Sequence, residues 1–183
     1  MVTLTDTDII QLIRKNNLNA NTLEETVVQM LQKHGLHLAT AESCTGGLLS
    51  ERITRVSGAS EVFDCGVCSY ANRIKEKVLG VHGDTLAVLG AVSAETAIQM
   101  AEGVKKLANA DIAVSTTGIA GPTGGTAEKP VGLVFVGVCT SNGSYALRLN
   151  LGGENTHNSR STIRRFTSDA ALFAVINELH KLS

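Results

Sequence analysis

Short apolar segments alternate with amphipathic segments along this chain, and that alternation constrains the fold more than any other feature of the sequence. The apolar segments have the length and composition of strands, and they are residues 36–41, 62–70, 111–116, 131–140 and 144–151. The intervening segments have apolar residues every three or four positions, as helices covering a sheet do, and they are residues 4–16, 22–33, 48–56, 72–79, 84–89, 93–107 and 159–182. Because Asn142-Gly143 predicts a tight hairpin between the last two strands, we expect a three-layer α/β/α fold with a mixed sheet.

The domain organisation follows from the length of the chain and from its lack of linkers. With 183 residues and no repeat or low-complexity tract, the chain fits a single domain with a sizeable core. Residues 22–183 carry the alternation of strands and helices and are predicted to form this domain. Residues 1–21 are predicted to be an N-terminal extension that contains one short capped helix.

Charge and composition exclude several classes of partner. The formal net charge is −1 and aromatic residues make up 3% of the chain, so it offers neither a basic field nor stacking residues for nucleic acid. No apolar stretch reaches the length of a membrane span, and the polar N-terminus lacks the apolar core of a secretory signal. We therefore expect a cytoplasmic protein with free thiols and without nucleic-acid or membrane partners.

Two of the four cysteines, Cys65 and Cys68, match a C-x-x-C pattern. A redox pair of this kind opens a helix, whereas here the pair lies in an expected strand. A zinc site requires a second pair of ligands at matching spacing, and the sequence has none. We therefore predict two buried structural thiols and no metal site.

The turn ESCTGG at residues 42–47 is the first candidate site. Ser43 follows an expected strand, and the glycines open a helix whose free N–H groups attract an anion or an oxyanion. Ser43 is then expected to stand beside its own oxyanion donors. The competing interpretation is that Ser43 or Thr45 only caps the helix and that the glycines only form a tight turn.

The loop TTGIAGPTGG at residues 116–125 is the second candidate. It contains four glycines, which let the backbone approach a ligand closely and offer N–H groups to a phosphate or an amide. Its spacing matches neither the dinucleotide-binding fingerprint nor the P-loop. The competing interpretation is a long surface loop without a ligand.

A serine nucleophile needs a base, and Lys75 is the best candidate. The five histidines carry no local signature of a catalytic triad. Lys75 follows the strand that ends at Tyr70, and a lysine whose pKa is lowered by desolvation can deprotonate a serine. Tyr70 is expected to relay a proton or to orient the amine. The competing interpretation is that Lys75 is one more exposed helix lysine beside Arg73 and Lys77.

Five ordered blocks of the sequence resemble the CinA C-terminal domain family of competence-damage-inducible proteins. The blocks are AESCTGG (41–47), SYANRIKEKVLGV (69–81), GAVSAETA (90–97), TTGIAGPTGG (116–125) and KPVGLVFVGV (129–138). They occur in the order and with the spacing of that family across residues 22–182, and residues 1–21 fall outside the resemblance. The resemblance implies an α/β/α domain of the CinA C-terminal type.

The resemblance also implies an activity, because stand-alone members of the family are similar to PncC-type nicotinamide-nucleotide amidohydrolases. Such enzymes convert nicotinamide mononucleotide and water to nicotinic acid mononucleotide and ammonia in pyridine nucleotide salvage, and they need no metal or organic cofactor. By this resemblance Ser43 is the nucleophile, Lys75 the general base and Tyr70 a supporting hydroxyl. The substrate-binding positions that it implies are Cys44, Thr45, Gly46, Gly47, Asn72, Thr117, Gly118, Gly121, Gly124, Arg160 and Arg164.

The chain departs from the family pattern in two places. The family carries a short Gly-Asp-Arg-like turn before its last helix, whereas this chain reads GGENTHNSRSTIRRF, so Arg160 and Arg164 are the matches for a phosphate-binding arginine. The N-terminal domain of full-length CinA proteins is missing, so the chain is expected to be the amidohydrolase module alone. Family members often form homodimers, which predicts a homodimer here. The alternative function is a non-catalytic nucleotide-binding or interaction module of the same family.

Overall fold

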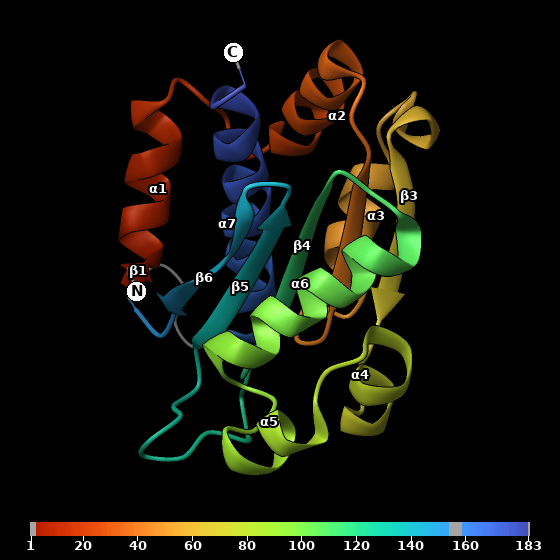
Figure 1. Ribbon diagram of the computed structural model, residues 1–183. Coiled ribbons are helices and arrows are strands. Elements are labelled where there is room, and N and C mark those ends of the chain that lie inside the picture. Colours follow the sequence, from red (N-terminus) through yellow and green to blue (C-terminus); the bar gives the residue numbers. More distant parts are fainter. Residues whose placement is uncertain (1–2, 154–158, 183) are drawn as a thin grey trace.

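The computed structural model describes residues 3–153 and 159–182 and has one six-stranded sheet (Figure 1). The strands are β1 (Thr3–Thr5), β2 (Leu38–Glu42), β3 (Phe63–Cys68), β4 (Ile112–Gly118), β5 (Leu133–Thr140) and β6 (Gly143–Asn150). Their order across the sheet is β1-β6-β5-β4-β2-β3. β2 is parallel to β3 and β4, and β1 is parallel to β6, whereas β5 is antiparallel to both of its neighbours. The predicted mixed sheet is confirmed.

Helices cover both faces of the sheet, which confirms the predicted three-layer α/β/α fold (Figure 1). They are α1 (Asp6–Lys15), α2 (Leu23–His34), α3 (Leu48–Thr54), α4 (Asn72–Leu79), α5 (Gly83–Val88), α6 (Ala94–Ala108) and α7 (Arg160–His180), with a 3-10 turn at Ala59–Glu61. On one face α7 packs against β4 and β5 and contacts α1, α2 and α3. On the other face α6 packs against β2, β4 and β5 and contacts α4 and α5. Among the described residues, no helix has both the length and the apolar character needed to cross a membrane.

Local signals explain where the main elements begin and end. β2 is buried along its whole length because helices lie on both faces of the sheet, so its side chains do not alternate between buried and exposed. α6 begins after Ser93, whose hydroxyl accepts the backbone N–H of Thr96. α2 ends at Gly35, which has a φ of 63° that glycine adopts at little cost.

The structure contains a strand that the sequence did not predict. The sequence predicted a helix from residue 4, whereas β1 precedes α1 and pairs with Arg148–Asn150 at the edge of the sheet. α1 begins only after Thr5, because the Thr5 hydroxyl and the Asp8 carboxylate form a reciprocal capping box. A strand of three residues is too short to show alternation in a sequence.

The direction of the strands determines where a site can form. β2, β3 and β4 lie next to one another and run parallel, so their carboxyl ends lie side by side at one end of the strands. The segments that follow these strands include the turn after Glu42, the segment after Cys68 and the loop after Gly118. Both candidate glycine-rich segments and the lysine-bearing α4 therefore lie together at the carboxyl ends of these strands, which is where α/β folds bind their ligands.

A buried ion network ties α3, the helix that follows the first candidate turn, to α2 and α7. The Arg52 guanidinium is 2% exposed and donates to the carboxylates of Glu24 at 2.7 Å and Asp169 at 2.6 Å. It also donates to the Ser168 hydroxyl. Burial raises the pKa of the Asp169 carboxyl, and the charge of Arg52 opposes that rise. The network fixes α3 relative to both of its neighbouring helices.

Arg52→Ala is expected to destabilise the fold by about 3–5 kcal/mol, because it removes the nearest counter-charge of two buried carboxylates, whose other partners Arg55 and Arg165 lie 3.8 and 3.4 Å away. The matched control is Arg55→Ala at the end of the same helix. Arg55 is 52% exposed and pairs mainly with the exposed Glu51, so its loss is expected to cost at most about 1 kcal/mol. Urea denaturation measures both free energies of unfolding, and equal losses in the two variants would contradict the role given to Arg52.

Candidate active site

Ser43 lies directly after β2, at the edge of the sheet where three parallel strands end. Its backbone N–H donates to the Thr116 carbonyl at 2.9 Å, and the Ser69 N–H donates to the Glu42 carbonyl at 2.8 Å. The end of β2 is therefore held between the ends of β4 and β3. This position leaves Ser43 half-buried beside the segments that follow both neighbouring strands.

The amine of Lys75 lies against the hydroxyl of Ser43. Lys75, on α4, is 1% exposed, and its Nζ lies 3.0 Å from Ser43 Oγ and donates to the Ser69 carbonyl at 2.7 Å. The structure thus brings together the two residues that the sequence proposed as nucleophile and base. The competing interpretation of Lys75 as an exposed lysine is wrong, because α4 exposes Arg73 and Lys77 and buries Lys75.

Burial lowers the pKa of the Lys75 amine below its ordinary value of 10.5, and nearby Cys44 and Cys68 oppose this only in part. Within residues 3–153 and 159–182, no carboxylate lies within ion-pair distance of Nζ to favour the charged form. An uncharged amine at 3.0 Å from a hydroxyl can accept the hydroxyl proton. The arrangement supplies what a serine nucleophile requires.

The carboxylate of Glu42 occupies the start of α3. It is fully buried, and it accepts the Ser50 hydroxyl and, at 2.8 to 3.0 Å, the backbone N–H groups of Gly47, Leu49 and Ser50. The competing interpretation that Ser43 or Thr45 caps this helix is therefore wrong, because Glu42 does so. The expected oxyanion donors change as well. The Gly47 N–H already donates to the Glu42 carboxylate, whereas the N–H groups of Thr45 and Gly46 have no acceptor in the described part of the chain.

A buried pair of hydroxyls supports the turn that follows Ser43. Thr45 Oγ1 and Thr116 Oγ1 lie 2.6 Å apart, and both residues are fully buried. The sequence predicted Thr117 at this site, but successive residues of a strand face opposite sides of the sheet, and the Thr117 hydroxyl donates to the Ala91 carbonyl at 2.6 Å. Sequence reasoning missed Thr116, and the alternation along β4 was the signal that could have identified it.

Tyr70 lies at the rim of the site rather than beside the amine. Its side chain is 64% exposed, and its hydroxyl accepts a hydrogen bond from Arg160 Nη2 at 3.1 Å. Arg160 Nη1 donates to the Gly121 carbonyl at 2.8 Å. Arg160 therefore links α7 to the segments that follow β3 and β4. Neither Ser43 nor Lys75 is among the described hydrogen-bond partners of the Tyr70 hydroxyl.

The second predicted arginine, Arg164, contacts the turn itself. Its Nε and Nη2 both donate to the carbonyl oxygen of Thr45, at 3.0 and 2.5 Å. The sequence proposed Arg160 and Arg164 together as matches for a phosphate-binding residue. The structure separates them, since Arg160 lies at the rim and two donor nitrogens of Arg164 are directed at a backbone carbonyl.

The other predicted binding positions lie on the surrounding segments. Asn72 begins α4 and is exposed, Gly121 is buried and Gly124 is exposed in the loop after β4. Gly118 has a packing reason of its own, because a Cβ there would lie 2.6 Å from a methyl group of Val134 on β5. Close approach of two strands, rather than of a ligand, explains the glycine at that position.

The cysteines differ in exposure, and all four are free. Cys44 and Cys139 are buried, Cys65 is half-buried and Cys68 is exposed, so the prediction of two buried thiols in the C-x-x-C pair is wrong. Because β3 is an outermost strand of the sheet, Cys68 at its end reaches solvent. Burial raises the pKa of the Cys44 thiol to about 12, so this neighbour of Ser43 stays protonated.

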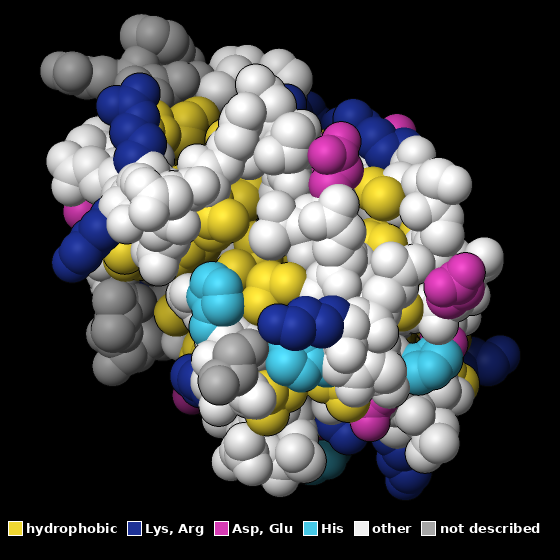
Figure 2. All heavy atoms as spheres, turned by 90° about the horizontal axis from the view of Figure 1, so that it is seen from above, with side chains coloured by type: hydrophobic (Ala, Val, Ile, Leu, Met, Phe, Trp, Pro, Cys, Tyr) yellow, Lys and Arg dark blue, Asp and Glu magenta, His cyan; other side chains and the backbone are white. Residues whose placement is uncertain are grey.

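Among the described residues, no metal-binding cluster and no group of histidines lies at this site. Within the described ranges, no group of three or more His, Cys, Asp or Glu residues could hold a metal ion. His37 pairs with Asp64 at 2.8 Å just before β2 begins, at the end of the sheet away from Ser43. Figure 2 shows that end of the molecule, where histidines lie at the surface and Lys and Arg side chains are scattered rather than continuous. His157 lies outside the described residues.

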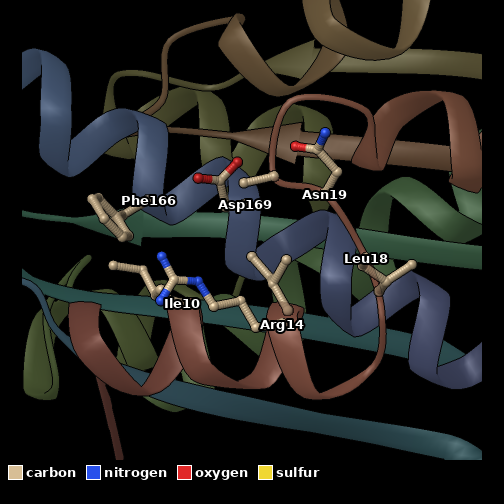
Figure 3. Close-up of a pocket in the computed structure, with 8 residues that line it drawn as sticks. Ile10, Arg14, Leu18, Asn19, Phe166 and Asp169 are labelled. Atoms are coloured by element: carbon tan, nitrogen blue, oxygen red, sulfur yellow. The ribbon is translucent and has the colours of Figure 1, made fainter.

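A separate cavity of about 370 Å³ lies between α1 and α7 (Figure 3). Its lining residues are Ile10, Ile13, Arg14, Leu18, Asn19, Ala20, Phe166 and Asp169. The Asp169 carboxylate already accepts hydrogen bonds from Arg52 and Arg165. None of the lining residues belongs to the pair formed by Ser43 and Lys75, so this cavity is distinct from the candidate active site.

Fold and site together define an α/β domain in which a buried lysine amine contacts a serine that follows a central strand. Comparison with known proteins identifies the family to which such a domain belongs. A family model for the CinA C-terminal domain matches residues 20–179. A competence-damage inducible relative from Thermoanaerobacter sp. (strain X514) is 60% identical over 145 residues, which are 79% of this chain and 34% of that protein. A CinA-like protein from Kosmotoga olearia is 52% identical over 153 residues, which are 84% of this chain and 35% of that protein.

This chain belongs to the CinA C-terminal domain family. The crystal structure of the competence/damage inducible protein CihA from Agrobacterium tumefaciens is 41% identical and superposes with a TM-score of 0.82, covering 86% of this chain and 94% of that one. A family structure from Klebsiella pneumoniae (MGH 78578) superposes with a TM-score of 0.83 at 32% identity and covers 90% of this chain and 99% of that one. The chain spans about a third of the length of the curated relatives that it matches.

The lowered pKa of Lys75 gives a measurable pH dependence of stability. In the folded protein the buried amine releases its proton below 10.5, the ordinary value that applies to the unfolded chain. At pH values between the lowered pKa of the folded protein and the ordinary pKa of the unfolded chain, the unfolded chain binds more protons than the folded protein. The contribution of Lys75 to the free energy of unfolding therefore rises with pH over this interval. In Lys75→Met this contribution is absent, and Tm is expected to rise less across that interval than in the wild type.

Differential scanning calorimetry as a function of pH measures this difference. The matched control is Lys77→Met on the same helix, where the exposed lysine leaves the pH dependence of Tm as in the wild type. Parallel curves for the wild type and Lys75→Met would show that the Lys75 amine is not desolvated.

Proposed function

We propose that this chain hydrolyses the carboxamide group of nicotinamide mononucleotide. The observation that carries the proposal is the 3.0 Å contact between the buried Lys75 amine and Ser43 Oγ. A desolvated amine can act as the base that a serine nucleophile needs. Family membership supports the proposal, because the resemblance to nicotinamide-nucleotide amidohydrolases rests on the sequence blocks that contain these two residues.

In the proposed reaction Ser43 Oγ attacks the carboxamide carbon, and the hydroxyl proton passes to Lys75 Nζ. The backbone N–H groups of Thr45 and Gly46, which Glu42 leaves free, stabilise the negative charge that develops on the carboxamide oxygen. Lys75 then gives the proton to the amide nitrogen, so the C–N bond breaks and ammonia leaves. Water attacks the acyl-enzyme with Lys75 as base, which releases nicotinic acid mononucleotide and restores Ser43. No metal or organic cofactor takes part in these steps.

The proposed phosphate-binding residue is Arg160. Its guanidinium is held at the rim by the Gly121 carbonyl and the Tyr70 hydroxyl, and its remaining N–H groups, which have no acceptor among the described residues, could meet a phosphate. Arg164 is less suited to that role because it donates to the Thr45 carbonyl. In this arrangement Tyr70 contributes by orienting Arg160, and its hydroxyl reaches the amine only if the side chain turns inward.

Two further expectations accompany the proposed activity. The four free cysteines fit a reducing compartment, and we propose a cytoplasmic location. We also propose a homodimer, on the resemblance to the family, and light scattering coupled to gel filtration measures the oligomeric state. Neither expectation enters the mechanism, since Ser43 and Lys75 come from the same chain.

Ser43→Ala is expected to abolish ammonia release from nicotinamide mononucleotide, because it removes the hydroxyl that lies 3.0 Å from the Lys75 amine. Lys75→Met is expected to lower kcat by about 10²–10⁴-fold, the usual contribution of a general base. Lys77→Met is the matched control and is expected to leave kcat within about 2-fold of the wild type. The assay measures ammonia released from nicotinamide mononucleotide, nicotinamide, nicotinamide riboside and NAD, and so tests the requirement for phosphate as well.

Two results would contradict the proposal. Wild-type turnover by Ser43→Ala would remove Ser43 from the mechanism. A wild-type protein that binds nicotinamide mononucleotide without releasing ammonia would instead be the non-catalytic nucleotide-binding module predicted as the alternative.

A further inference from the structure

The carbonyl oxygen of Thr45 accepts three hydrogen bonds, two of them from one distant side chain. Arg164 Nε and Nη2 donate to it at 3.0 and 2.5 Å, and the Leu48 N–H donates at 3.2 Å. Arg164 lies on α7, 119 residues further along the chain than Thr45. A long-range contact therefore fixes a single peptide group in the turn that follows Ser43.

The peptide group between Thr45 and Gly46 needs such a contact to keep one orientation. It is trans, so the Gly46 N–H points away from the Thr45 carbonyl and hence away from Arg164. Gly46 has a φ of 59°, and glycine adopts either sign of φ at little cost, so Gly46 would offer little resistance to a flip of this peptide group. A flip would replace the N–H by the carbonyl oxygen on the side facing away from Arg164.

We propose that Arg164 is a positioning residue, which holds the Thr45 carbonyl and thereby aims the Gly46 N–H at the oxygen that becomes negative when Ser43 attacks. This inference rests on the proposed function and names a residue that sets the strength of its oxyanion site. The guanidinium also polarises the peptide group, which makes the Gly46 N–H a stronger donor. Arg164 itself touches no reacting atom.

The positioning role differs measurably from a phosphate-binding role. A residue that binds phosphate contributes to the affinity for phosphorylated substrates and leaves other reactions of Ser43 unchanged. A residue that positions an oxyanion donor contributes to the rate at which Ser43 attacks any electrophile whose oxygen enters the oxyanion site. The two roles therefore separate when the electrophile carries no nucleotide.

The test variant is Arg164→Lys, because lysine keeps the positive charge but lacks the planar fork that holds one carbonyl with two nitrogens. The matched control is Arg165→Lys, since the neighbouring Arg165 contacts Asp169 and Ala20 and not the turn after Ser43. The probe is an alkyl fluorophosphonate. Ser43 Oγ bonds to its phosphorus, fluoride leaves, the hydroxyl proton passes to Lys75, and the phosphoryl oxygen enters the oxyanion site.

Arg164→Lys is expected to lower kcat for nicotinamide mononucleotide by about 10–100-fold with KM within about 2-fold, and to slow labelling of Ser43 by a similar factor. Arg165→Lys is expected to stay within about 2-fold of the wild type in both measurements. The pH profile of labelling is expected to keep its position in Arg164→Lys, because Lys75 and its surroundings are unchanged.

Several outcomes would overturn the positioning role. For Arg164→Lys they are labelling at the wild-type rate, or a rise in KM without a change in kcat. For Arg165→Lys the outcome is a loss of kcat and labelling rate equal to that of Arg164→Lys. For the wild type it is the failure of the fluorophosphonate to label Ser43. The failure of the proposed function is distinguishable from these. If labelling depends on Arg164 but the wild type releases no ammonia from nicotinamide mononucleotide, the substrate is wrong and the positioning role stands.

Discussion

The exclusion of the Lys75 amine from water is the interaction on which the candidate site depends. A buried ammonium ion without a carboxylate partner is costly, and in the described part of the chain the Lys75 amine has the Ser69 carbonyl and the Ser43 hydroxyl as its hydrogen-bond partners. Close packing of α4 on α6 maintains this burial. Gly103 on α6 allows it, because a Cβ there would lie 1.9 Å from the Leu79 carbonyl oxygen at the end of α4. Helix packing, and not a local sequence signature, thus buries the amine of the proposed base.

Two other buried charges hold the opposite side of the site in place. Glu42 satisfies the N–H groups at the start of α3, and Arg52 ties the same helix to α2 and α7. Glu42 is satisfied by hydrogen bonds and Arg52 by two carboxylates, so neither needs a ligand to be stable. The turn that carries Ser43 is therefore bounded by a strand and a fixed helix before any substrate arrives, and catalysis of acyl transfer benefits from such preorganisation.

Periodicity and turn chemistry were enough to predict most of the architecture, whereas Ser43 and Lys75 were only candidates until the family resemblance paired them. Both residues follow neighbouring parallel strands, so strand direction alone brings their segments together. The sequence could not show that Glu42 caps α3, because its role depends on how the chain turns after β2. The partner of Tyr70 was equally hidden, since it lies 90 residues away on α7. Local patterns predict elements, whereas these contacts depend on the packed tertiary structure.

The short strand β1 affects how the sheet meets its surroundings. Without Thr3–Thr5, the backbone of Arg148–Asn150 would lie at an unpaired edge and could template pairing with a strand of another molecule. The region shared with the family begins at residue 20, so a version trimmed to that boundary would lose β1 together with α1, which packs on α7. With β1 in place, part of the edge of β6 is covered and the outermost strand has only three residues, and very short edge strands are one way in which proteins limit edge-to-edge aggregation.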